Sequence, residues 1–159
     1  MSFTSKYISQ AGIIAALYAV MTIILAPISY GPLQVRVSEA LTVLPYLTPA
    51  AIPGLFLGCL LANIYGGLGL YDIIGGSLIT LLAAFFTYLL SRIKRPVLAP
   101  LPPIFLNAFG VSLYLHFLFK MPYWLTVAYV GMGEIVACYF LGYPLLKIIL
   151  TRKRWKEYF

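Results

Sequence analysis

The chain has 159 residues, of which 62% are hydrophobic and 9% are charged. A typical soluble domain is about one-quarter charged, so this composition excludes a soluble globular protein and predicts a single membrane domain over residues 1–159. The net charge is +7, but the basic residues stand at the ends of apolar runs, which indicates membrane topology and not nucleic-acid binding.

Apolar segments recur along the whole chain, separated by prolines, glycines or basic residues. A helix needs about 20 apolar residues to cross the hydrocarbon core. We expect membrane-spanning helices at residues 8–28, 37–47, 52–65, 71–91, 103–119 and 123–150. The second and third are short, which is tolerated where a helix tilts or packs within protein. The sequence therefore predicts an all-α integral membrane protein, a six-transmembrane-helix bundle.

The basic residues predict the orientation of this bundle. Six spans place both termini on one side, and an inside amino terminus makes most Lys and Arg residues cytoplasmic: Lys6, Arg92, Lys94, Arg95, Lys147, Arg152, Lys153, Arg154 and Lys156. Arg36 and Lys120 then lie outside. By the positive-inside rule, we expect a multi-pass protein of the plasma membrane with both termini cytoplasmic. The interfacial aromatic residues would be Tyr30, Tyr123 and Trp124 outside and Trp155 inside.

Polar side chains inside a membrane are costly, so each is a candidate functional residue. Six fall on the outer half of the predicted bundle: Arg36, Glu39, Asn63, Asp72, Asn107 and Glu134. Because the inner half is mostly apolar, this distribution favours a substrate pocket open to the outside, whereas a continuous aqueous pore would need polar residues along its whole length.

Most of these residues have a structural alternative. Glu39 and Asp72 could complement helix starts, Arg36 could form a surface ion pair with Glu39, and the asparagines could join helices by hydrogen bonds. Glu134 has no such explanation within its Val-Gly-Met-Gly-Glu-Ile-Val segment. His116, between aromatic residues, is interpreted as interfacial. Four tyrosines fall near the predicted pocket, where a flat heterocycle could stack: Tyr30, Tyr65, Tyr71 and Tyr114.

Small residues recur at helical spacing in two segments. Ala11, Ala15 and Ala19 form a smooth strip on the first helix, which serves either internal packing or the docking of another helix. Gly54 and Gly58 form a second strip, which we expect to pack inside the bundle.

No catalytic or cofactor signature accompanies these features. Cys59 and Cys138 stand in apolar stretches without metal-ligand spacing, and the chain has neither a phosphate-binding P-loop nor a nucleophile elbow. We therefore expect that the protein holds no metal or cofactor and is not an enzyme. Energy for active transport would have to come from a partner.

Three segments carry a family resemblance: GPLQVRVSEALTVLP at 31–45, GCLLANI at 58–64 and DIIGGSLITLL at 72–82. They resemble the substrate-binding S component of energy-coupling factor (ECF) transporters, of the queuosine-precursor type, and the resemblance extends over nearly the whole chain. It implies the six-helix S-component fold, a 7-deazaguanine base or queuine as ligand, and a transmembrane coupling protein with two ATPase subunits as partners.

The resemblance further implies that the alanine strip, Ala11, Ala15 and Ala19, docks on the coupling protein, and that the loaded S component topples within the membrane. The segment 29–35 is placed to act as a lid. Four other functions stay open: an S component for a vitamin or other heterocycle, an energy-independent facilitator, an intramembrane enzyme that uses Glu134, Asp72 or His116, and a purely structural membrane subunit, against which Glu134 argues.

Overall fold

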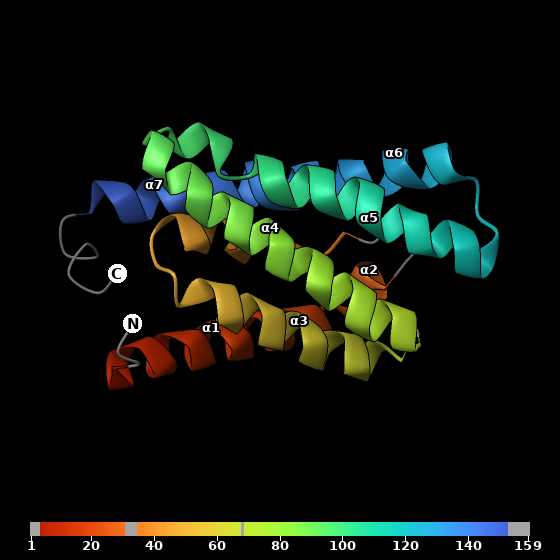
Figure 1. Ribbon diagram of the computed structural model, residues 1–159, viewed down its shortest axis with the longest axis horizontal. Helices are drawn as coiled ribbons and strands as arrows, with labels where there is room; N and C mark the ends of the chain where they lie inside the picture. The colour runs from red at the N-terminus through yellow and green to blue at the C-terminus, as the bar shows by residue number, and fades with distance from the viewer. Residues whose placement is uncertain (1–3, 31–34, 68, 153–159) are drawn as a thin grey trace.

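The computed structural model describes residues 4–30, 35–67 and 69–152, which form an elongated helical bundle without a β-strand (Figure 1). The elements are α1 Ser5–Ile24, α2 Ala26–Ser29, η1 Val37–Tyr46, α3 Ala51–Gly66, η2 Asp72–Gly76, α4 Ser77–Leu90, η3 Ser91–Ile93, η4 Pro96–Leu98, α5 Leu101–Phe119, α6 Tyr123–Glu134, η5 Ile135–Gly142 and α7 Tyr143–Thr151. The all-helical fold predicted from the sequence is confirmed for these residues.

Four helical segments are long and apolar enough to cross a membrane: Ser5–Ile24, Asp72–Ile93, Pro96–Phe119 and Tyr123–Thr151. They coincide with the first, fourth, fifth and sixth predicted spans. The second and third predicted spans are shorter elements, the 10-residue 3-10 helix η1 and the 16-residue helix α3. Large apolar side chains such as Ile24, Phe117 and Phe140 are at least 70% exposed, which suits a bundle surrounded by lipid.

The first predicted span ends earlier than the apolar run does. α1 stops at Ile24, and the short helix α2 continues from Ala26 with Pro27 in its first turn. Proline has no N–H for an intrahelical hydrogen bond and its ring clashes with the preceding turn, so the chain breaks there. The last span is continuous instead, because the π-helix η5 joins α6 directly to α7.

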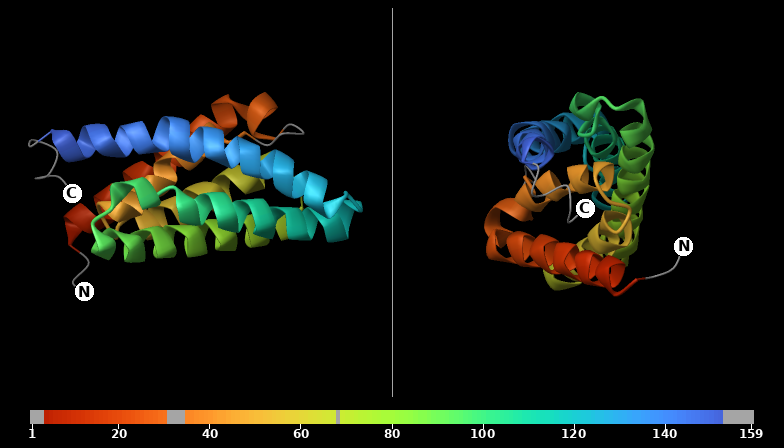
Figure 2. Two further views of the ribbon diagram at one scale, coloured as in Figure 1. Left: turned by 90° about the horizontal axis from the view of Figure 1, so that it is seen from above. Right: turned by 90° about the vertical axis from the view of Figure 1, so that its left-hand side faces the viewer.

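The two ends of the bundle differ in charge. One end of the bundle holds the start of α1, the end of α7 and the η3–η4 connection. The turn from α5 to α6 lies at the other end (Figures 1 and 2). The elements at the first end carry Lys6, Arg92 and Lys147, and the α5–α6 turn carries Lys120. This agrees with the predicted segregation of basic residues, although Trp155 and the tail residues Lys153, Arg154 and Lys156 fall outside the described residues.

α1 packs closely against α3 because two glycines leave room for its backbone. A Cβ atom added to Gly54 would stand 2.8 Å from the carbonyl oxygen of Ala11, and one added to Gly58 would stand 2.8 Å from that of Ala15. The prediction that Gly54 and Gly58 pack inside the bundle is confirmed.

The same packing concerns the alanine strip on the first helix, for which docking on a partner stays a prediction. Ala11, Ala15 and Ala19 are at most 9% exposed, and Ala11 and Ala15 lie against the glycines of α3, so the strip is buried in this conformation. Gly12 and Ala16 are among the exposed small residues of α1, and a Cβ atom at Gly12 would meet nothing within 4 Å.

Candidate functional site

The six polar residues singled out by the sequence lie in one buried cluster. They come from the segment before η1, from η1 itself, and from α3, η2, α5 and α6. The six residues are at most 8% exposed; they are Arg36, Glu39, Asn63, Asp72, Asn107 and Glu134. Ionisable groups at such depth are kept only where other groups compensate for the loss of water.

Arg36 is held by partners from α3 and η2. Its Nη1 donates a hydrogen bond of 3.0 Å to Oδ1 of Asn63, and its Nη2 lies 3.8 Å from Oδ1 of Asp72. The ring of Tyr30 lies 5.6 Å from the guanidinium carbon, within range of a cation–π contact. The ion partner of Arg36 is therefore Asp72, and the alternative of a surface pair with Glu39 is wrong.

Asn63 and Tyr114 complete this half of the cluster. The amide nitrogen of Asn63 donates a hydrogen bond of 3.0 Å to the backbone carbonyl of Asp72, and the Tyr114 hydroxyl donates one of 2.5 Å to Oδ1 of Asp72. Oδ2 of Asp72 is buried without a hydrogen-bond partner among the described residues. Asp72 is thus more than a helix-start acid, because it joins Arg36, Asn63 and Tyr114.

Gly76 allows the backbone of η2 to approach this network. A Cβ atom there would stand 2.9 Å from the amide nitrogen of Asn63 and 3.6 Å from the Tyr114 hydroxyl. Any larger residue would displace the asparagine.

Glu39 and Glu134 form the other half of the cluster. The hydroxyl of Tyr18, a fully buried residue of α1, donates a hydrogen bond to Oε1 of Glu39. Oε2 of Glu39 is buried and has no hydrogen-bond partner in the described part of the chain. Oε2 of Glu134 lies 3.4 Å from the thiol of Cys138, and the Asn107 amide lies beside both carboxyl groups.

A small cavity joins the two halves. Four of the predicted residues line it, Arg36, Glu39, Asn107 and Glu134, together with Gly76, Thr80, Val111 and Val130. Its volume is about 10 Å³, enough for about one water molecule. Pockets that hold small organic ligands measure roughly 300–1,000 Å³. The site is therefore closed in this conformation, and its walls must separate to admit a heterocycle.

The aromatic predictions divide. Tyr30 and Tyr114 contact the cluster, whereas Tyr65 and Tyr71 are more than 60% exposed and do not line the cavity. Tyr30 and Tyr114 are thus the two tyrosines that the structure brings to the cluster, and a stacking role for Tyr65 and Tyr71 stays a prediction. His116 is exposed and its Nδ1 lies 2.6 Å from the carbonyl of Met121 at the α5–α6 turn, outside the cluster.

Two site residues were missed by the sequence reasoning. The sequence did contain a signal for Tyr18, because a tyrosine hydroxyl in the middle of an apolar span needs a hydrogen-bond partner. Thr80 lines the cavity, but its sequence gives no signal. Its hydroxyl donates a hydrogen bond of 3.1 Å to the Gly76 carbonyl, as threonines within helices commonly do.

Four helices able to cross a membrane, with a buried polar cluster between them, define a multi-pass membrane protein. The chain matches the model of the family described as QueT transporter over residues 8–151, and it therefore belongs to the QueT transporter family. It is 30% identical over 142 residues to the queuosine precursor transporter QueT of Lactococcus lactis subsp. cremoris (strain MG1363), covering 82% of this chain and 83% of that protein. No solved structure matches the chain significantly.

Proposed function

We propose that this protein binds a queuosine precursor, a 7-deazaguanine base or queuine, with high affinity. We further propose that it acts as the S component of an ECF transporter in the plasma membrane, together with a transmembrane coupling protein and two ATPase subunits. The substrate class follows the name of the Lactococcus relative. The observation that supports it best is the placing of Glu39, Glu134 and Asn107 on one closed cavity.

The chemistry of this cavity suits a guanine-like edge. Such an edge presents adjacent N–H donors and a carbonyl acceptor. A carboxylate accepts two adjacent donors in a paired contact, a role open to Glu39 through its unpaired Oε2 and to Glu134. We therefore propose both glutamates as substrate-binding residues.

The carbonyl of the ligand needs a donor, for which Asn63 and Asn107 are the candidates. The Asn63 amide is already engaged with Arg36 and the Asp72 carbonyl, which favours Asn107. Arg36 and Asp72 also border the site, so Asp72 could pair with the ammonium group of an aminomethyl precursor.

Ligand entry requires that the bundle open. The predicted site residues come from segments on both sides of the cavity, and its volume of about 10 Å³ excludes a base. We propose that the bundle has six spans with both termini cytoplasmic, and that the ligand enters from the outward end. A toppling motion of the loaded protein would then deliver it to the cytoplasmic side. In the proposed lid, 29–35, residues 31–34 lie outside the described residues.

Docking of the coupling protein would use the exposed face of α1. Gly12 and Ala16 stand four positions apart on this face, a spacing that lets a second helix approach closely. Gly12→Leu with Ala16→Leu should abolish uptake in cells that contain the coupling module and leave ligand binding intact. Val20→Leu, on the same face, is the matched control.

The substrate proposal is tested by titrating the purified protein in detergent with 7-deazaguanine bases, with guanine as the control. Glu39→Gln and Glu134→Gln should each weaken binding about tenfold or more, because a neutral amide replaces a charged acceptor. Glu157→Gln removes the fourth acid of the chain and should change nothing. If no deazaguanine binds to folded protein, the substrate assignment is wrong, and a panel of vitamins tests the alternative S component.

The ECF assignment needs a separate measurement. Uptake should require the coupling module and ATP. Uptake into liposomes that contain this protein alone would support an energy-independent facilitator instead.

A further inference from the structure

The buried cluster holds more acidic than basic groups. All three acids of the described chain belong to it, Glu39, Asp72 and Glu134, and each is at most 4% exposed. Among the described lysines and arginines only Arg36 is buried, and the others are exposed. With three carboxylates and one guanidinium, the ionised cluster has a surplus of negative charge. Because an unpaired charge away from water is costly, a cation bound here would be stabilised.

The surplus charge rests on the two glutamates of the cavity. Nη2 of Arg36 lies 3.8 Å from Oδ1 of Asp72, so the guanidinium is already matched by an acid that does not line the cavity. Glu39 and Glu134 both line it, and they lie close enough for their charges to repel each other. Asn107 is beside both carboxyl groups, but a neutral amide cannot balance either charge.

The two glutamates differ in what their oxygens contact. Oε1 of Glu39 accepts a hydrogen bond from the Tyr18 hydroxyl, whereas Oε2 is buried without a partner among the described residues. Oε2 of Glu134 lies 3.4 Å from the thiol of Cys138, which is a weak donor. Glu134 can therefore offer both oxygens to the adjacent N–H groups of a guanine-like edge. The one free oxygen of Glu39 suits a single contact with a compact cation such as an ammonium group.

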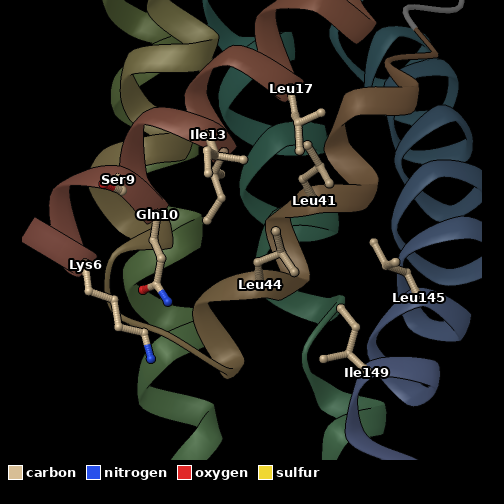
Figure 3. A pocket seen from close by; sticks show the side chains of 10 residues that line it. Lys6, Ser9, Gln10, Ile13, Leu17, Leu41, Leu44, Leu145 and Ile149 are labelled. Carbon is tan, nitrogen blue, oxygen red and sulfur yellow. The ribbon is translucent and has the colours of Figure 1, made fainter. Parts of the chain in front are cut away.

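The larger groove of the molecule offers a cation no such partner. It has a volume of about 440 Å³ and lies between α1, η1 and α7. Its lining is mostly aliphatic, with side chains such as Leu17 and Leu44, and Lys6 stands at one end (Figure 3). None of the three described acids lines it. The charge distribution therefore directs a cationic heterocycle to the polar cavity.

We propose that the site selects a deazaguanine whose 7-substituent carries an ammonium group, and that Oε2 of Glu39 accepts this group while Glu134 binds the ring edge. The inference rests on the proposed function, because it selects among the deazaguanines considered there. A 7-aminomethyl base and its N-alkylated derivatives fit the site, and a 7-cyano base does not. The ammonium group pairs with Glu39 and not with Asp72, since Arg36 already matches the charge of Asp72.

The test is calorimetric titration of the purified protein in detergent at neutral pH with two 7-deazaguanine bases of similar size. One carries an aminomethyl group, which is protonated under these conditions, and the other carries a neutral hydroxymethyl group. The protein should bind the aminomethyl base about tenfold more tightly or better. Equal affinities would overturn the selection of a cation and leave the proposed function standing. If folded protein binds neither base, the proposed function fails, and this proposal fails with it.

Two variants locate the ammonium group. Glu39→Gln should reduce the preference for the aminomethyl base to about twofold or less, because the amide carries no charge to attract it. Glu134→Gln changes the same group on the opposite wall of the site, and it should weaken both bases about equally and so keep the preference. A preference that survives in Glu39→Gln, or that is lost in Glu134→Gln or Asp72→Asn instead, would overturn the assignment to Glu39.

Discussion

Arg36 donates a hydrogen bond of 3.0 Å to Asn63, a residue 27 positions further along the chain. Asn63 in turn donates to the backbone carbonyl of Asp72 at 3.0 Å. One amide therefore connects the segment before η1 with α3 and η2, and it uses both its acceptor and its donor to do so. Through this connection the buried guanidinium stays fixed at the edge of the cavity.

Asn63→Ala should destabilise the protein and weaken ligand binding together. The substitution leaves an Arg36 N–H and the Asp72 carbonyl without their partner, and an unsatisfied buried polar group costs about 1–3 kcal/mol. We expect a lower thermal midpoint in detergent and at least tenfold weaker deazaguanine binding. Thr87→Val removes a 3.3 Å bond to the Ala99 carbonyl away from the cavity and should leave the affinity unchanged. Unaltered affinity in Asn63→Ala would show that the position of Arg36 does not matter for recognition.

Tyr18→Phe should weaken ligand binding about tenfold, or about 1.4 kcal/mol. The ring stays in place, but Glu39 loses the hydroxyl that orients its carboxyl group. Tyr139→Phe is the matched control, since it loses a 2.9 Å bond to the Val97 carbonyl outside the site. Calorimetric titration of both variants measures the difference, and equal effects would remove Tyr18 from the site.

Gly76→Ala should abolish binding while Gly75→Ala preserves it. A methyl group at 76 would stand 2.9 Å from the Asn63 amide nitrogen and push it from Arg36, whereas one at 75 would stand 3.6 Å from the Tyr114 ring, an ordinary contact. The pair differs by one position in the same π-helix, so the comparison separates crowding from helix propensity. Similar affinities in the two variants would contradict this account.

Gly58→Ala and Gly12→Ala should shift the thermal midpoint in opposite directions. At 58 the methyl group would stand 2.7 Å from the Cβ atom of Tyr18 and 2.8 Å from the Ala15 carbonyl, so α1 must move away from α3. At 12 there is open space, and alanine in a helix is favoured over glycine by about 1 kcal/mol. A midpoint that rises in both variants would mean that the contact between α1 and α3 is looser than described.

The buried polar cluster was predictable because burying polar groups is costly. Arg36, Glu39, Asp72 and Glu134 are ionisable residues in apolar surroundings, and such groups are retained in a membrane protein for a purpose. What the sequence could not reveal was their partners. Arg36 pairs with Asp72 and not with nearby Glu39, because the path of α3 and η2 brings the more distant acid closer.

The apolar runs and their lengths by themselves determined that this is a helical membrane protein, since the backbone of a lipid-exposed segment must satisfy its own hydrogen bonds. Tertiary structure alone decided which side of each helix faces inward. In the sequence, the alanines at positions 11 and 15 fit a partner helix and an internal neighbour equally well, and in the structure the glycines of α3 let its backbone approach them. The closed cavity likewise arises only from packing, because its walls come from segments far apart in the chain.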